Sequence, residues 1–157
     1  LTAWDACFAV LFLGVVPLLA YPMQKWIPGY KTRGREGQRE LAFIFNIAGY
    51  IAAWGYGLIS DASRELQFIF NAYLLSVLIL SAVNKLLRVR ASGHACSVIA
   101  PAGFACYFGV YAFAGVYLVL AAASMWASVY LKRHKPSDML WGVLTFACAF
   151  FIATLFL

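Results

Sequence analysis

Charged residues are scarce in this chain. They make up 11% of its 157 residues, whereas hydrophobic residues make up 64%, and the mean hydropathy is +0.82. A soluble domain usually carries about 25% charged residues. This deficit excludes an ordinary soluble domain and predicts a membrane protein that crosses the bilayer several times. The length fits one domain.

Paired cysteines are also lacking. The four cysteines all lie inside apolar runs, and no two of them form a Cys-x-x-Cys pair. Neither a zinc site nor a disulfide framework is therefore indicated, and the cysteines read as small packing residues. We expect no metal and no cofactor.

Acidic residues are half as frequent as basic ones, at 6 against 12, which gives a net charge of +6. An excess of positive charge is typical of nucleic-acid binding. Here, however, the cations sit in short segments between apolar runs, where they serve membrane orientation and contact lipid headgroups. We therefore expect membrane lipids, and not nucleic acid, as partners.

The apolar runs predict an all-α fold. A membrane-spanning helix needs about 20 apolar residues. The uncharged run 95–131 is too long for one span, so we expect a hairpin of two short helices that turns near 109–115. The other spans are expected at 6–23, 41–59, 68–87 and 139–157. The sequence thus predicts a polytopic membrane bundle of six transmembrane helices that forms a single domain, residues 1–157.

Six spans place alternate connections on the same side of the membrane. The polar segments 24–40, 85–94 and 132–138 then share one face, which holds eleven of the 12 Lys and Arg residues; Arg64 lies on the other. Cytoplasmic loops carry an excess of Lys and Arg. The basic face is therefore expected in the cytoplasm. In the first span, Pro17 predicts a kink.

Segment 85–94 carries groups that can bind and process a phosphate. Cationic side chains bind phosphate, a helix N-terminus favours an anion, and a histidine can protonate a leaving oxygen. The candidates are Lys85, Arg88, Arg90, Ser92, Gly93 and His94. The alternative is a basic cluster whose side chains reach the interface and only fix the topology.

Segment 128–142 carries a second set of candidates. His134 and Asp138 are four residues apart, and Pro136 suits the first turn of a helix beginning between them. A carboxylate in that turn can fix the tautomer of the imidazole and stabilise its positive charge, which makes the histidine a good nucleophile. Arg133 precedes the histidine directly. The alternative is a basic loop between two spans in which His134 is merely solvated.

Together the two segments resemble a known family. Ser92-Gly93-His94 followed by Val129-Tyr130-Leu131-Lys132-Arg133-His134-Lys135-Pro136-Ser137-Asp138 is similar to motifs of the type 2 phosphatidic acid phosphatase superfamily, which includes the vanadium haloperoxidases. The resemblance implies a lipid phosphatase of phospholipid metabolism that needs no metal. His134 would form a phospho-histidine, Asp138 would orient it, and His94 would protonate the leaving group. Lys85, Ser92 and Gly93 would hold phosphate oxygens.

The chain departs from the signature of that superfamily in its first motif, where the Arg-Pro pair is absent and Lys85 with Arg88 or Arg90 must stand in. Two single positions differ as well. Ala91 stands where the signature has Pro, and Ser128 stands where it has an Arg that grips phosphate. We expect Arg88, Arg90 or Arg133 to supply the missing cation. The expected substrate is a phosphomonoester or a diphosphate on a lipid, such as phosphatidate or a polyprenyl diphosphate.

Two other classes of protein remain open at this point. One is a non-catalytic relative that acts as a structural or binding subunit of a membrane assembly or as a homo-oligomer, and Ser128 favours it. The other is a haem-carrying electron-transfer protein, since two histidines on different spans can ligate haem. Against haem, both histidines lie in strongly basic segments.

Overall fold

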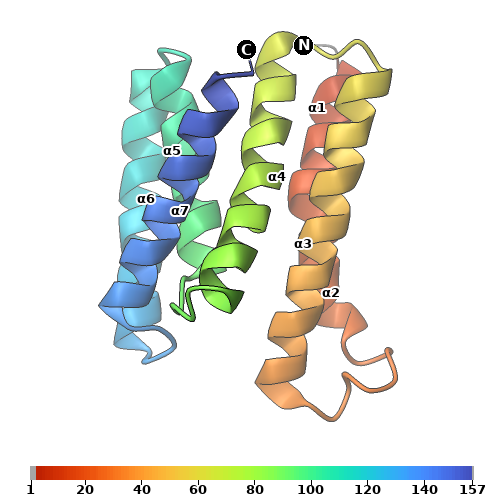
Figure 1. Cartoon of the computed structure of the whole chain (residues 1–157), viewed down its shortest axis with the longest axis vertical. Coiled ribbons are helices and arrows are strands. Elements are labelled where there is room, and N and C mark those ends of the chain that lie inside the picture. Colours follow the sequence, from red (N-terminus) through yellow and green to blue (C-terminus); the bar gives the residue numbers. More distant parts are fainter. Residues whose placement is uncertain (1–2, 157) are drawn as a thin grey trace. The chain divides into compact units, whose positions relative to one another are not determined.

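The chain folds into helices joined by short connections (Figure 1). A computed structural model describes residues 3–156, and no strand occurs among them. The elements are α1 (Ala3–Val10), the π-helical segment η1 (Leu11–Val15), α2 (Val16–Met23), α3 (Gly34–Ile59), α4 (Arg64–Lys85), α5 (Gly93–Tyr107), α6 (Tyr111–Tyr130) and α7 (Pro136–Thr154). The predicted all-α class is confirmed.

The described residues group into two compact units that meet within α4. The first unit runs through Leu74 and the second from Leu75 to Phe156. The expected single domain spanning the whole chain stays a prediction. All the candidate site residues named above belong to the second unit.

In the first unit, α1, η1 and α2 follow one another without a break. The π-helical turn ends at Val15, two residues before Pro17. Pro17 has no N–H and its ring crowds the carbonyl one turn earlier, which explains a change of helical register at this place in the chain. Gly49 of α3 lies against the backbone carbonyl of Phe12, where any Cβ would clash. Close approach of the two helices therefore depends on this glycine.

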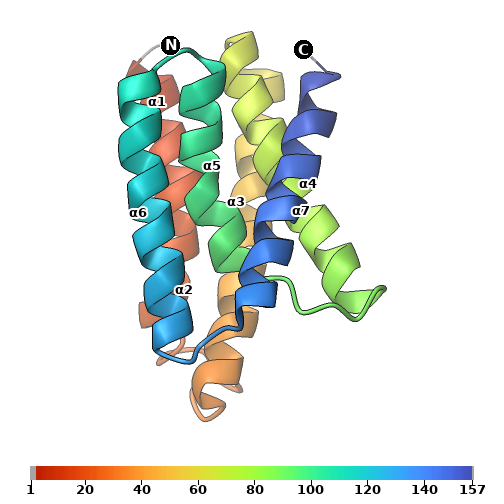
Figure 2. The same ribbon diagram turned by 90° about the vertical axis from the view of Figure 1, so that its left-hand side faces the viewer.

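In the second unit, α5 and α6 form the predicted hairpin (Figure 2). The turn occupies residues 108–110, where Gly109 has a positive φ of 74°, a conformation that suits glycine. The expectation of two short helices is wrong for one of them, because α5 has 15 residues and α6 has 20. Helix α5 also packs against α7. The N-termini of α5 and α7 and the C-terminus of α6 lie at the same end of this unit.

Five helical segments within residues 3–156 are long and apolar enough to cross a membrane. They are Ala3–Met23, Gly34–Ile59, Arg64–Lys85, Tyr111–Tyr130 and Pro136–Thr154. Helix α5 is the exception, since 15 residues extend only about 22 Å at about 1.5 Å per residue, and the hydrocarbon layer is about 30 Å thick. The chain thus has the character of a multi-pass membrane protein.

Candidate functional site

Asp138 is the point at which the polar segments of the second unit meet. It occupies the third position of α7, where its Oδ2 accepts a hydrogen bond of 3.1 Å from the Lys135 N–H. The same oxygen lies 3.6 Å from His134 Nδ1 and 3.6 Å from Arg90 Nε. Its side chain is only 5% exposed. A buried carboxylate needs such partners, because leaving a charge unpaired away from water costs several kcal/mol.

The end of α6 determines where His134 lies. The N–H of Lys132 donates to the carbonyl of Val129 (2.9 Å), and the N–H of Arg133 donates to that of Ser128 (3.0 Å). Lys132 has a φ of +53°. This pattern is a Schellman motif, which reverses the chain directly after a helix. His134 therefore lies directly before Lys135, the N-cap residue of α7, and beside the first turn of that helix.

The two motif segments are joined through the backbone. The Ser92 N–H donates to the Asp138 carbonyl at 2.9 Å. Ser92 is only 1% exposed, and its hydroxyl caps α5 by accepting from the Ala95 N–H at 3.3 Å. Any Cβ on Gly142 would clash with the carbonyl of Ser92. Ser92 thus has a structural role, while Gly142 allows α5 to lie directly against α7.

A second contact fixes the chain just before Ser92. The Asn84 side chain accepts from the Ala91 N–H at 3.0 Å and donates to the Ala91 carbonyl at 3.2 Å. This paired contact, here called the Asn84 clamp, connects the last turn of α4 to the connection before α5. Proline at position 91 has no N–H to donate. Alanine at position 91 therefore permits a contact that proline would remove.

A basic hollow of about 340 Å³ opens beside these groups. Four of its seven lining residues are Lys or Arg, and one is a histidine. The lining consists of Arg90, Val129, Lys132, Arg133, His134, Lys135 and Pro136. Such a concentration of positive charge favours a phosphate-sized polyanion. Of the three arginines expected to replace the missing cation, Arg90 and Arg133 line the hollow.

Four expected phosphate ligands lie outside that lining, namely Lys85, Arg88, Ser92 and Gly93, and so does His94, the expected general acid. For Ser92 the reason is its burial as a helix cap. Lys132 and Lys135 line the hollow although their roles were not expected. The sequence could have indicated that these two lysines belong to the site, because they lie within two residues of His134, one on each side.

His94 turns towards α6. Its Nε2 lies 2.8 Å from the Oγ of Ser124, a hydrogen bond whose direction depends on the tautomer. His94 precedes the apolar stretch that begins at Ala95. Partial desolvation lowers the pKa of the imidazole from its ordinary value of 6.5, and the positive charge of Arg133 lowers it further. The sequence carried no signal for Ser124, since it lies 30 residues away in a run of apolar and small residues.

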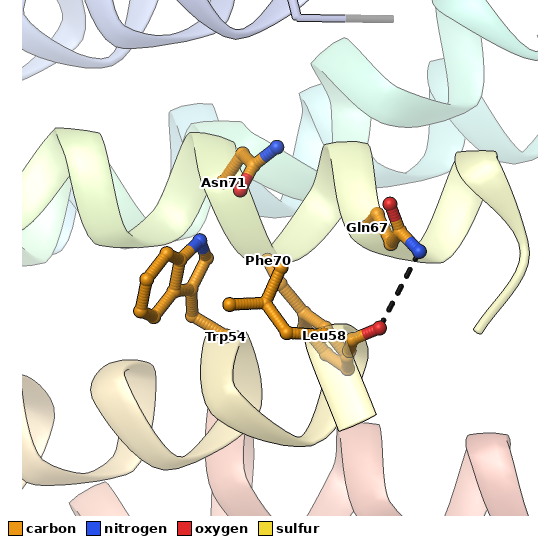
Figure 3. Close-up of a pocket in the computed structure, with 6 residues that line it drawn as sticks. Trp54, Leu58, Gln67, Phe70 and Asn71 are labelled. Atoms are coloured by element: carbon orange, nitrogen blue, oxygen red, sulfur yellow. Dashed lines mark hydrogen bonds between the residues drawn. The ribbon is translucent and has the colours of Figure 1, made fainter. Parts of the chain in front are cut away.

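A second, much smaller cavity lies between α3 and α4 in the first unit (Figure 3). It measures about 30 Å³ and is lined by Trp54, Gly57, Leu58, Gln67, Phe70 and Asn71. The Gln67 amide donates to the carbonyls of Gly57 (3.3 Å) and Ala62 (2.9 Å). The volume suits a single water molecule. The basic hollow is therefore the stronger candidate for a substrate site.

No protein-family model, no curated protein and no solved structure matches this chain. The resemblance to the phosphatase superfamily accordingly rests on the motif residues alone.

Proposed function

We propose that this protein is an integral-membrane lipid phosphatase that works through a phospho-histidine. The observation that carries the proposal is the arrangement around Asp138. A histidine and an arginine approach one buried carboxylate oxygen at 3.6 Å each, and both line the same basic hollow. A histidine held by a carboxylate beside a cluster of cations suits nucleophilic attack on a phosphate ester.

In the first step, His134 attacks phosphorus and the bond between phosphorus and the leaving oxygen breaks. Asp138 faces Nδ1, so Nε2 is the attacking nitrogen, and the carboxylate stabilises the positive charge that the ring acquires. His94 gives a proton to the leaving oxygen. In the second step, His94 takes a proton from water, which attacks the phospho-histidine and releases inorganic phosphate.

The cations of the hollow stabilise the negative charge that develops on the phosphoryl oxygens. Arg90 and Arg133 offer forked hydrogen bonds, whereas Lys132 and Lys135 act as point charges. The substrate class is a lipid carrying a phosphomonoester or a diphosphate. Its headgroup would enter the hollow while its tails stay among the apolar helices.

The proposed topology has six spans and a cytoplasmic basic face. Helix α5 from Ala95 onward is the sixth span, since its sequence is uncharged there and a tight turn joins it to α6. A short helix can be accommodated by local thinning of the bilayer at modest cost. The excess of Lys and Arg on the predicted polar face supports its cytoplasmic side.

A non-catalytic relative is the second candidate function, and a specific residue favours it. Ser128 offers one hydroxyl where the superfamily signature has a guanidinium. The backbone carbonyl of Ser128 accepts from the N–H groups of Arg133 and His134 (3.0 and 3.4 Å), a contact that does not involve the serine side chain. In this alternative the basic hollow binds a phosphorylated lipid without turning it over.

Phosphate release from a panel of lipid phosphates and diphosphates by the purified protein separates the two candidates. We expect His134→Ala to abolish release, because the covalent route is lost. We expect His94→Ala to slow it by about 10²–10⁴-fold, the usual worth of general acid–base help. Arg64→Gln, a cation outside the site, is the matched control and should keep wild-type activity. Unchanged release by His134→Ala would contradict the proposal, and an inactive wild type would favour the binding role.

A further inference from the structure

The polar segment 24–40 of the first unit, here called the basic connector, joins α2 to the start of α3. It contains five cations and two carboxylates, so its net charge is 5 − 2 = +3. Candidate membrane spans lie directly before and after its first ten residues, at Ala3–Met23 and Gly34–Ile59. A connection between two spans has to lie at the membrane surface.

The basic connector is held together by its own hydrogen bonds. The Gln24 amide donates to the carbonyls of Tyr30 (3.1 Å) and Gly34 (2.6 Å). Gly37 packs so closely that an added Cβ would lie 2.8 Å from the Cβ of Arg33. These contacts give the segment a defined shape before any ligand arrives.

One of the five cations serves this internal structure. Arg33 forms a double contact with the Glu40 carboxylate, at 2.6 and 3.2 Å. Its guanidinium also lies 5.7 Å from the centre of the Tyr30 ring. Arg33 and Glu40 therefore neutralise each other's charge within the segment.

The other four cations point outward. Lys25, Lys31, Arg35 and Arg39 are exposed, and within residues 3–156 none of them forms an ion pair with a carboxylate. Trp26, beside Lys25, is 84% exposed. Tryptophan favours the headgroup level of a bilayer, and clustered Lys and Arg next to a span attract anionic lipids.

We infer that the basic connector is a binding surface for anionic phospholipid headgroups. Once Arg33 and Glu40 are paired, the surface has four exposed cations and one carboxylate, Glu36. Its net positive charge is therefore complementary to a negatively charged leaflet. Trp26 anchors the surface at the depth where the phosphate groups lie. This surface belongs to the first unit and the basic hollow to the second, so the inference does not depend on the proposed phosphatase activity.

Hydrogen exchange of the full chain in lipid nanodiscs tests the inference. One set of discs contains phosphatidylcholine alone and the other contains phosphatidylcholine with phosphatidylglycerol. We expect slower amide exchange in residues 24–40 in the anionic discs only, and we expect high salt to remove the difference because it screens exposed charges. The combined variant Lys25→Gln, Lys31→Gln, Arg35→Gln and Arg39→Gln should lower the affinity for phosphatidylglycerol at least about tenfold.

The matched control removes the same number of charges from the second unit, by replacing Lys85, Arg88, Lys132 and Lys135 with Gln. It should leave the exchange of residues 24–40 unchanged. The inference would be overturned by equal exchange of residues 24–40 in neutral and anionic discs, or by a difference that persists in high salt. It would also be overturned if the control variant lost the slower exchange of residues 24–40 to the same extent as the fourfold variant of the basic connector. The salt test uses the wild-type chain, so it decides the question even if the fourfold variant fails to insert.

Discussion

Asp138 is the residue of the second unit that contacts the largest part of the candidate site. The Asp138 carboxylate faces the Lys135 N–H, His134 and Arg90, and its backbone carbonyl accepts from Ser92. These partners offset the free-energy cost of burying the negative charge, so removing one of them would destabilise the ionised carboxylate. The proposed nucleophile and the proposed phosphate ligands are thus tied to the same residue.

Position 128 provides the first prediction at this scale. We expect Ser128→Arg to raise phosphate release by up to about 10²-fold, because it adds a forked donor to the developing charge. Replacing Arg90 or Arg133 by Gln should lower release in the wild-type background, because both line the hollow. The measurement is steady-state turnover of a lipid phosphate, with Arg88→Gln as control. No gain from Ser128→Arg, together with no loss from either Gln variant, would show that neither Arg90 nor Arg133 compensates for Ser128.

The protonation of His94 provides the second prediction. As a general acid it must carry a proton, so kcat/KM should fall as pH rises through its pKa, which lies below the ordinary value of 6.5. Arg133→Gln removes a positive charge that lowers this pKa, so the fall should move to higher pH. Arg133→Lys keeps the charge and should leave the fall in place. Identical pH profiles for the two variants would contradict a role for His94 as the acid.

At the scale of the elements, the connections between helices carry the candidate site. The Schellman motif after α6 ends at Arg133 and the capping contact of α7 begins at Lys135, so His134 is held between two defined backbone contacts. The Asn84 clamp fixes the connection after α4 in a similar way. The helices supply the membrane spans, and their ends supply the chemistry.

The Asn84 clamp provides the prediction at this scale. Ala91→Pro should destabilise the protein by about 1–3 kcal/mol, because the side-chain oxygen Oδ1 of Asn84 loses its donor. Proline also restricts the backbone of Arg90, the preceding residue. Thermal unfolding in detergent measures the effect, and Ala91→Ser, which keeps the N–H, is the control. An unfolding temperature equal to that of Ala91→Ser would show that the clamp contributes nothing.

For the whole molecule, the distribution of positive charge yields a prediction about topology. In the proposed six-span arrangement, a cysteine introduced at Lys31 or Lys135 reacts with an impermeant reagent only from the cytoplasmic side. A cysteine introduced at Arg64 reacts from the opposite side. The background is a chain with its four native cysteines replaced by Ala, labelled in intact and in opened cells. Labelling of Lys135 and Arg64 positions from the same side would contradict the six-span arrangement.

The sequence by itself determined the class of the fold and the membrane character of the chain. Long apolar runs can satisfy their backbone groups within a bilayer only as helices or as closed barrels, and runs of this length are typical of helices. The start of α7 at Pro136 was equally readable, because proline and the acidic residue two positions later both favour a first turn. The proximity of His134 and Asp138 follows from that local geometry.

Only the tertiary structure decided the remaining features. The pairing of Arg90 with Asp138 and of His94 with Ser124 joins residues 48 and 30 positions apart, and no local pattern encodes such distances. The short length of α5 depended on the turn forming at Gly109, the first residue of the predicted region 109–115, and the apolar run alone does not say which end of that region turns. The burial of Ser92 depended on Gly142, since close helix packing is a property of two surfaces and not of either sequence alone.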